Sequence, residues 1–265
     1  MLTQAFEMLF GTSFVIIFQL RKKTQKRMST YSLHPDSIRK LFDSIAPTYD
    51  FLNHLLSLRR DLYWRKMAVR ELKGVGGWIL DIGTGTADVA IEIIQQDGHR
   101  KKVLGLDFSE PMIRRARQKI LKKGLCHSIA LSRGDAIELP FRESAFSASI
   151  IAFGLRNIPK KEQALLEMIR VLKKGGKVIV LEFTFPKDVW MGRLYAFYFK
   201  KCLPWFGGLI SGDRGAYAYL PESVSQFPDA KDYEEILKRS GLEKIRSLKL
   251  TFGIASIISG TKRHL

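Results

Sequence analysis

The chain has 265 residues, of which 46% are hydrophobic, so it can build one large folded domain and is not globally disordered. Its 44 lysines and arginines against 26 acids give a formal net charge of +18, which favours an anionic partner such as nucleic acid or a phospholipid surface, although such charge can also serve solubility alone. Cys126 and Cys202 lie far apart and match no zinc spacing, so we expect neither a disulfide nor a zinc site and infer a reducing cytoplasm.

Residues 1–30 are expected to lie outside the folded domain. The stretch from Met8 to Leu20 is largely apolar, but it is shorter than the roughly 20 residues that a membrane-spanning helix needs. Basic residues follow this stretch rather than precede it, which is the reverse of a secretory signal. Two interpretations remain open: an arm that contacts a membrane, or a translation start placed too early, with Met28 as the true first residue. We expect residues 31–265 to form the domain itself.

Residues 36–72 are predicted to form helices ahead of the first strand. Apolar side chains recur there at helical spacing, and a proline at position 47 ends the first helical stretch. The middle of the segment is unusually rich in polar side chains for a layer that only packs on a sheet. We therefore expect a helical cap across a ligand cleft, rather than a helix that only covers the sheet edge. The polar side chains are Asp43, Tyr49, Asp50, Asn53 and His54.

From Trp78 onward, apolar strands alternate regularly with amphipathic helices. Such alternation predicts parallel βαβ units in a doubly wound α/β sheet, with the ligand at the carboxyl ends of the strands. We expect Gly175-Gly176 to break the last of these helices before its strand. The predicted strands are Trp78–Ile82, Lys102–Asp107, Ser128–Gly134, Ala148–Phe153 and Lys177–Phe183. The predicted helices are Ala87–Gln96, Pro111–Lys122 and Lys160–Leu172.

The chain changes character after Pro186. Residues 187–225 are rich in aromatic, basic and glycine residues, and we expect them to form an insertion over the cleft. A helix is predicted at Asp232–Ser240, and Leu242–Leu250 with Ile254–Gly260 predicts a closing β-hairpin. A terminal antiparallel pair of this kind is unusual in a dehydrogenase domain.

The stretch from Trp78 to Asp88 joins a buried strand to a helix through a glycine-rich turn. Gly83 and Gly85 carry no Cβ, so the backbone can approach a ligand closely there. A dinucleotide-binding fingerprint would need a third glycine where Asp88 stands. Asp81, directly before the glycines, would repel a pyrophosphate but attract a cationic or zwitterionic ligand such as S-adenosylmethionine. The turn therefore favours S-adenosylmethionine over a dinucleotide.

Two further acids end or follow the next strands. Asp107 closes the second strand, where a carboxylate can accept hydrogen bonds from ribose hydroxyls, although a helix N-terminus also favours an acid at this place. Asp135 follows the third strand, where the exocyclic amine of an adenine would lie, with the Ala136 backbone beside it. Phe108 can cover the adenine ring or pack in the core.

Several motifs together resemble a known enzyme family. Motifs of the class I S-adenosylmethionine-dependent methyltransferases are resembled by Asp81-Ile-Gly-Thr-Gly-Thr86, Leu106-Asp107, Gly134-Asp135-Ala136 and Leu139-Pro-Phe141. The ubiquinone/menaquinone C-methyltransferase family (UbiE/MenG type) is resembled more specifically by Tyr49–Ser57 with Trp64-Arg65, by Phe153-Gly-Leu-Arg-Asn157, and by Arg170–Gly176 with Leu181-Glu-Phe183. The resemblance runs from about Ile38 to Lys262. Departures such as Lys174 in place of a proline concern fine cofactor contacts and substrate range.

This resemblance implies a seven-stranded, Rossmann-like class I methyltransferase sheet, preceded by the helical cap and closed by the antiparallel hairpin. It also implies S-adenosylmethionine as the methyl donor and no metal. The cofactor contacts carried over from the family are Thr86, Asp107, Asp135 and Ala136. The glycine-rich turn adds Asp81, Gly83 and Gly85 to the expected cofactor site.

The implied reaction transfers a methyl group to a ring carbon of a polyprenylated quinol, either demethylmenaquinol or 2-polyprenyl-6-methoxy-1,4-benzoquinol. Loss of a phenolic proton pushes electron density onto the adjacent ring carbon, which attacks the sulfonium methyl in line. Arg156 and Asn157 are expected to hold or polarise the quinol oxygens. Arg156 is too basic to accept the proton, so water or His54 is expected to take it. His54 can equally be a structural histidine, and Arg156 one half of a surface ion pair.

A polyprenyl quinol lives in the bilayer, so we expect a cytoplasmic protein in peripheral contact with the inner face of the membrane. The aromatic and basic stretch from Trp190 to Phe206 and the excess positive charge suit such a contact. No nucleic-acid partner is expected, and a homo-oligomer is left open.

Two alternatives to quinol methylation remain. The positive charge invites an RNA methyltransferase. Amino-directed nucleic-acid methyltransferases, however, carry a polar-Pro-Pro-aromatic motif where Phe153–Asn157 stands here. The second alternative is a non-catalytic ligand-binding protein of the same fold. An intact cofactor turn together with Arg156 and Asn157 argues against it.

Overall fold

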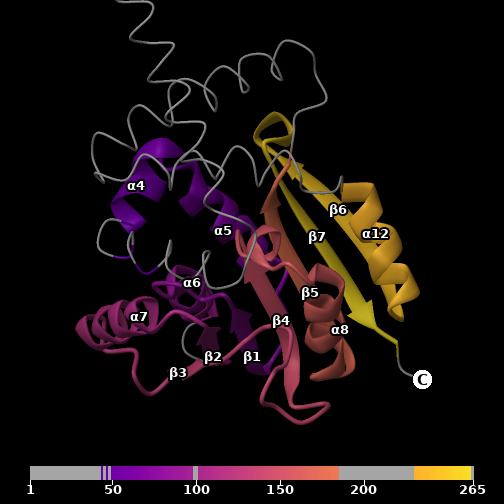
Figure 1. Cartoon of the computed structure of the whole chain (residues 1–265), viewed down its shortest axis with the longest axis horizontal. Helices are drawn as coiled ribbons and strands as arrows, with labels where there is room; N and C mark the ends of the chain where they lie inside the picture. The colour runs from indigo at the N-terminus through magenta and orange to yellow at the C-terminus, as the bar shows by residue number, and fades with distance from the viewer. Residues whose placement is uncertain (1–42, 44–45, 47–48, 98–100, 185–229, 264–265) are drawn as a thin grey trace, which may run out of the picture.

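The computed structural model describes residues 43, 46, 49–97, 101–184 and 230–263 (Figure 1). The predicted arm at residues 1–30 and the predicted insertion at residues 187–225 lie outside the described residues. No helix in these described ranges is long and apolar enough to cross a membrane.

Seven strands of the described chain form one sheet in the order β3-β2-β1-β4-β5-β7-β6. Neighbours among the first five strands run parallel, whereas β7 lies antiparallel between β5 and β6. The strand order reverses between β1 and β4, which is where open α/β sheets bind ligands. The predicted doubly wound sheet with a terminal antiparallel pair is confirmed. The strands are β1 (Gly77–Ile82), β2 (Lys101–Asp107), β3 (Ile129–Arg133), β4 (Phe146–Ala152), β5 (Leu172–Phe183), β6 (Leu242–Leu250) and β7 (Ala255–Lys262).

Helices cover both faces of this sheet (Figure 1). They are α4 (Tyr49–Leu56), α5 (Arg60–Arg70), α6 (Asp88–Asp97), α7 (Glu110–Lys122), α8 (Lys161–Arg170) and α12 (Ala230–Arg239). On one face, α5, α6 and α7 bury apolar side chains such as Trp64, Ile93 and Ile120 against the strands. On the other face, α8 and α12 do the same through Leu165 and Leu237. Because both faces are covered, the central strands β1 and β4 are apolar on both sides.

The helices α4 and α5 precede the first strand, as the sequence predicts for a cap. Leu58 and Arg59 join them with φ angles of 51° and 60°, a left-handed backbone that turns the chain sharply. α5 packs against α6 and β5, and Tyr49 at the start of α4 reaches the carboxyl ends of the strands.

The structure differs from the sequence prediction at Gly175-Gly176. Both residues lie inside β5, so the prediction that they separate α8 from its strand is wrong. β5 pairs with β4 at Leu172 and again from Lys177, which leaves residues 173–176 as a bulge between two paired regions. Gly175 has a φ of 73°, and a Cβ at Gly176 would lie 2.8 Å from a backbone oxygen of the bulge. The glycines are therefore required by the bulge. The predicted helical stretch before Pro47 lies outside the described residues except at positions 43 and 46. The remaining predicted elements begin and end within a few residues of those observed.

Candidate active site

A cleft with about 650 Å³ of empty space opens at the carboxyl ends of β1, β2 and β4. Its walls are the glycine-rich turn after β1, the end of β2, the loop after β3 and the turn after β4. This is the edge of the sheet at which the strand order reverses, as expected for the ligand site. Six of the predicted site residues line the cleft: Gly83, Gly85, Asp107, Asp135, Ala136 and Asn157.

The glycine-rich turn holds the floor of the cleft open. Gly83 and Gly85 have φ angles of 62° and 55°, which glycine adopts without strain. A Cβ at Gly83 would meet only the Cα of Gly154, at 4.0 Å, and one at Gly85 would meet only the ring of Tyr49, at 3.9 Å. The turn therefore leaves room for a ligand between β1 and β4, and Tyr49 covers it from the cap.

Asp107 fixes this turn to the end of β2. Its Oδ2 accepts a hydrogen bond from the Gly85 backbone N–H at 2.8 Å, and its Oδ1 accepts one from the Ser109 N–H at 2.9 Å. Burial raises the pKa of Asp107 to about 6, and these backbone donors partly offset the shift. A carboxylate can accept further hydrogen bonds beyond these two, so Asp107 can hold the turn and bind ligand hydroxyls together.

Asp81 lies beneath the turn and is not among the residues that line the cleft. The Thr84 hydroxyl donates to its Oδ2 at 2.6 Å. Burial raises the pKa of Asp81 to about 7 despite this hydrogen bond. The contact to Thr84 gives Asp81 a part in shaping the turn.

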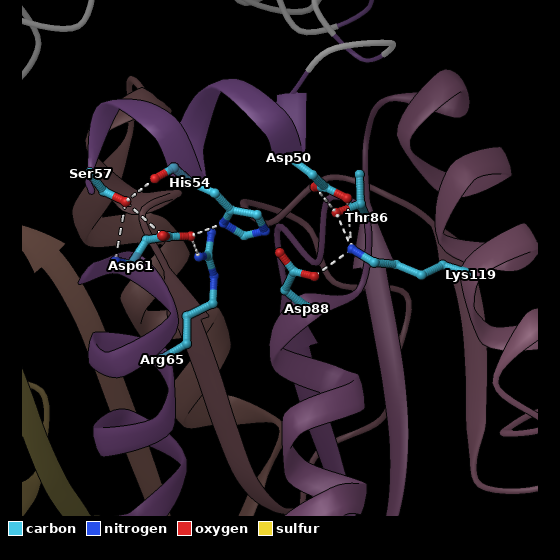
Figure 2. Close-up of polar contacts among 8 residues, drawn as sticks. All are labelled: Asp50, His54, Ser57, Asp61, Arg65, Thr86, Asp88 and Lys119. Carbon is cyan, nitrogen blue, oxygen red and sulfur yellow. Dashed lines mark hydrogen bonds and ion pairs between the residues drawn. The ribbon is translucent and has the colours of Figure 1, made fainter. Parts of the chain in front are cut away.

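Thr86 is buried and connects the cap to the turn (Figure 2). Its hydroxyl donates to Asp50 Oδ1 of α4 at 2.5 Å, and Lys119 of α7 donates to Asp50 Oδ2 at 2.7 Å. Lys119 also pairs with Asp88 at the start of α6. Burial lowers the pKa of Lys119, but the Asp88 and Asp50 carboxylates outweigh it, and the net shift is upward. The Thr86 hydroxyl thus links α4, α6 and α7 behind the cleft.

His54 lies within the cap and is not among the residues that line the cleft (Figure 2). Its Nδ1 is 2.8 Å from Oδ2 of the buried Asp61, to which Arg65 also binds. The Ser57 hydroxyl donates to Asp61 Oδ1 at 2.6 Å. Burial alone would raise the pKa of Asp61, but Arg65, Ser57 and His54 outweigh it and lower the pKa. These contacts hold α4 against α5.

Arg156 and Asn157 lie in a short 3₁₀ turn (Leu155–Asn157) directly after β4. Arg156 Nη1 donates to Glu182 Oε1 at 2.5 Å and to the Phe153 carbonyl at 2.6 Å. The Arg156 backbone N–H donates to the other Glu182 oxygen at 3.1 Å. Arg156 Nε is buried and has no hydrogen-bond partner among the described residues. Asn157 lines the cleft itself and donates to the Phe153 carbonyl at 3.3 Å.

Three aromatic rings pack beside Arg156. The Phe153 and Phe183 ring centroids are 4.6 Å apart, and Trp64 of α5 lies 6.0 Å and 5.8 Å from them. The Arg156 guanidinium lies 5.2 Å from the Phe183 centroid, and the Arg65 guanidinium lies 5.4 Å from that of Phe153. Of these residues Phe153 lines the cleft, so the aromatic cluster stands directly behind its wall, and each guanidinium is paired with a buried carboxylate, Arg156 with Glu182 and Arg65 with Asp61.

Residues 29–262 match the ubiE/COQ5 methyltransferase family. The chain belongs to this family. It is 40% identical to the ubiquinone/menaquinone biosynthesis C-methyltransferase UbiE of Geobacter sulfurreducens, covering 91% of this chain and 93% of that protein. It is 44% identical to the demethylmenaquinone methyltransferase of Thermus thermophilus, covering 84% of this chain and all of that protein.

Solved structures of low sequence identity show the same fold. The [4+2]-cyclase SpnF has a TM-score of 0.65 at 17% identity, over 86% of this chain and 97% of that chain. A Thermotoga maritima S-adenosylmethionine-dependent methyltransferase, a possible histamine N-methyltransferase, has a TM-score of 0.61 at 21% identity, over 85% of this chain and all of that chain. At such identities the likeness concerns the fold alone.

Family membership makes the chain an S-adenosylmethionine-dependent C-methyltransferase of menaquinone or ubiquinone biosynthesis. The curated relatives give no support to the RNA methyltransferase alternative.

The residues that line the cleft fit S-adenosylmethionine. Gly83 leaves open a space that a side chain would fill, and the Asp107 carboxylate lies beside the turn. Asp135 and Ala136 line the cleft after β3, where the Asp135 carboxylate accepts from the Ile137 N–H at 3.1 Å. In the described part of the chain, no group of three or more His, Cys, Asp or Glu side chains is arranged to hold a metal ion.

The sequence places Tyr49 in the cap and Glu182 in a family motif, but it predicts a site role for neither. Burial raises the pKa of Tyr49, which lines the cleft, although Arg65 and Arg156 partly offset the shift. Glu182 is buried and holds Arg156. A usable signal for Glu182 existed, because β5 is an apolar strand that ends in an acid, as do β1 with Asp81 and β2 with Asp107. Phe108 and Met112 complete the apolar lining of the cleft.

Proposed function

We propose that the chain methylates a ring carbon of a polyprenylated naphthoquinol, demethylmenaquinol, with the corresponding benzoquinol as a second candidate substrate. The observation that carries this proposal is Arg156, which is not itself among the cleft-lining residues but directly precedes the cleft-lining Asn157, and whose buried Nε has no hydrogen-bond partner among the described residues. A buried donor without a partner costs roughly 1–3 kcal/mol, so its presence calls for an acceptor that arrives with the ligand. A quinol oxygen is such an acceptor.

In the proposed reaction, the quinol hydroxyl loses its proton and the phenolate pushes electron density onto the adjacent ring carbon. S-adenosylmethionine supplies, when bound, a methyl group carried on a sulfonium. Arg156 stabilises the phenolate by charge, and Asn157 donates to the same region of the cleft. A new C–C bond forms as the bond between the sulfonium sulfur and the methyl group breaks, which would leave S-adenosylhomocysteine, and the ring carbon then releases its proton, which restores aromaticity.

The apolar wall of the cleft supports this reaction by excluding water. Ile151, Phe153 and Ile158 line the β4 side, and Phe108 and Met112 line the β2 side. Low polarity strengthens the attraction between Arg156 and a phenolate, and it protects the developing carbanion character from bulk solvent.

Water is the proton acceptor in this proposal. His54 is bound to Asp61 in the cap and is not among the cleft-lining residues. Arg156 is paired with Glu182, and in this proposal its remaining Nε–H donates to the phenolate, so water suffices as the proton acceptor.

The test is a quinone extract from a strain that lacks this gene, with and without a plasmid that restores it. We expect demethylated naphthoquinone to accumulate in the deletion strain and the plasmid to reverse this. Purified protein with S-adenosylmethionine should methylate a reduced demethylnaphthoquinol, with the benzoquinol as the comparison substrate. An unchanged quinone pool would overturn the proposal.

We also propose peripheral contact with the inner face of the membrane by a cytoplasmic protein. Leu58 between α4 and α5 and Phe252 at the tip between β6 and β7 are 79% and 78% exposed. Both tips lie towards the cleft end of the sheet. β7 starts opposite Phe183 at the end of β5, and α5 runs from Leu58-Arg59 to the turn that enters the amino end of β1. Exposed apolar side chains amid basic charge suit a lipid surface. The predicted stretch Trp190 to Phe206 lies outside the described residues.

Co-sedimentation with phosphatidylglycerol vesicles tests this contact. We expect Leu58→Ser/Phe252→Ser to lower the bound fraction. The matched control is Leu121→Ser/Leu166→Ser, which changes two exposed leucines on α7 and α8. Equal binding by both double variants would contradict the proposed surface.

A further inference from the structure

A second hollow, with about 720 Å³ of empty space, lies at the amino ends of the strands, on the opposite side of the sheet's length from the cofactor cleft. It is formed by the turn between α5 and β1, by Ser147 near the start of β4, and by the bulge of β5. β1 and β4 run parallel, and the cleft lies at their carboxyl ends while this hollow lies at their amino ends. The two sites are therefore separated by the length of the strands.

Four lysines line this hollow, Lys73 from the first turn and Lys173, Lys174 and Lys177 from the second, and no carboxylate does. In the part of the chain that the structure describes, none of them forms an ion pair. By contrast, Lys101 and Lys119 are each paired with aspartates. Lys177 is held by a 2.9 Å hydrogen bond to the Glu71 carbonyl, which fixes its ammonium at the rim.

Glycines occupy four of the positions that line the hollow and add no side chain to it. A Cβ at Gly74 or Gly76 would meet no atom within 4 Å, so both turn residues face open space. At Gly176 a Cβ would collide with the backbone of the bulge, 2.8 Å away. Gly74 and Gly175 both have φ near 75°, at 79° and 73°, a backbone shape that appears in anion-binding turns.

We propose that this hollow binds a small soluble anion that carries phosphate, with a diphosphate group as the preferred ligand. Four lysines that share one hollow without a carboxylate among its lining residues repel one another, and a multiply charged anion relieves that repulsion. Ser147 adds a hydroxyl that can donate to a phosphate oxygen. The hollow lies at the amino ends of β1 and β4, away from the cleft end, so we assign the phosphate to a soluble ligand rather than to a lipid headgroup.

The experiment is titration of the full chain with sodium diphosphate by calorimetry at low and moderate salt. We expect Lys173→Ala/Lys174→Ala to weaken the affinity by about tenfold or more, because two of four converging charges are removed. The matched control is Lys122→Ala/Lys123→Ala, which removes two exposed lysines at the end of α7 and should change the affinity by less than about twofold. Binding of S-adenosylhomocysteine, measured in parallel, should be equal in all three proteins and reports that they are folded.

Phosphatidylglycerol vesicles form the second arm. We expect Lys173→Ala/Lys174→Ala and the control to sediment with vesicles to the same extent. Selective loss of vesicle binding in Lys173→Ala/Lys174→Ala would overturn the assignment to a soluble ligand. Equal loss of diphosphate affinity in both double variants, or no diphosphate binding by the unaltered chain, would overturn the site itself. None of these outcomes depends on quinol methylation.

Discussion

Arg156 Nη1 donates to Glu182 Oε1 at 2.5 Å, and both side chains are buried beside the cleft. Glu182 also accepts from the backbone N–H of Arg156 and from that of Phe183. The pair therefore sets both the position of the guanidinium and the shape of the turn after β4. Because one donor of Arg156 is left over, Glu182 is a positioning residue for the group that faces the quinol.

Replacing Arg156 or Glu182 should lower turnover more than it weakens cofactor binding. We expect Arg156→Ala to lower kcat by about 10²-fold or more, with little change in the affinity for S-adenosylhomocysteine, because the residue stabilises the phenolate and not the cofactor. Glu182→Ala should lower kcat as well and destabilise the fold by about 3–5 kcal/mol, because it leaves a buried charge unpaired. Glu182→Gln keeps a hydrogen-bond acceptor and the shape of the side chain, so it should recover part of both the kcat and the stability that Glu182→Ala loses.

The control for this pair is Glu167→Gln, which alters a comparable Arg–Glu pair with Arg170 on α8. It should cost stability without a selective loss of kcat. An Arg156→Ala variant with normal turnover and weakened cofactor binding would contradict the division of roles.

Much of this site can be predicted from the sequence, because the ends of the strands can be recognised in it. Apolar runs that end in Asp81 and Asp107 predict the edge of the sheet where the cleft lies, and the glycines between predict its floor. Local sequence could not predict that the Thr86 hydroxyl would be engaged by Asp50, 36 residues away. That contact depends on the tertiary packing of the cap on the sheet.

The same limit applies to His54 and to the bulge in β5. The His54 imidazole is bound by Asp61 because α4 and α5 fold back on each other at Leu58-Arg59, and helical periodicity does not reveal such a turn. Consecutive glycines commonly end a helix, so the sequence predicts a helix end at Gly175-Gly176. Here β5 resumes pairing beyond them, and that pairing is set by β4.

Asp107 should make cofactor affinity depend on pH. Its pKa of about 6 means that the carboxylate is charged at pH 8 and becomes protonated as the pH falls through 6. Protonation removes a charge-assisted acceptor, so we expect the Kd for S-adenosylhomocysteine to rise below pH 6, approaching about tenfold for each further pH unit. At pH 8 the Asp107→Asn variant should bind S-adenosylhomocysteine at least about tenfold more weakly than the unaltered chain, and its Kd should depend less on pH. Calorimetry from pH 5 to 8 measures both; parallel profiles for the two proteins would exclude Asp107 as the titrating group.

The link between the cap and the turn should also be measurable. Asp50→Asn removes a charge that faces Lys119 and weakens the contact to Thr86. We expect the KM for S-adenosylmethionine to rise about threefold to tenfold with a smaller change in kcat, because the cap then holds the turn less firmly. Steady-state kinetics measure this. Glu110→Gln, which removes an exposed ion pair with Arg114, is the control and should leave KM unchanged. A fall in kcat alone would show that Asp50 acts on the chemical step instead.

Asp81 should make the stability of the protein fall as pH rises. Burial raises its pKa to about 7 in the folded chain, above the value of 3.8 for an exposed aspartate. The folded state therefore keeps a proton that the unfolded state has already lost, and this contribution to stability is complete below about pH 4 and lost as the pH rises through 7.

Asp81→Asn stays neutral at every pH. We expect its free energy of unfolding, relative to the unaltered chain, to increase between pH 5 and pH 8 by on the order of 2–4 kcal/mol. Urea unfolding at several pH values measures this difference, with Glu110→Gln as the surface control. A difference that does not change with pH would show that Asp81 is already ionised at pH 5, and the burial of a charged carboxylate beneath the turn would then require a partner other than Thr84.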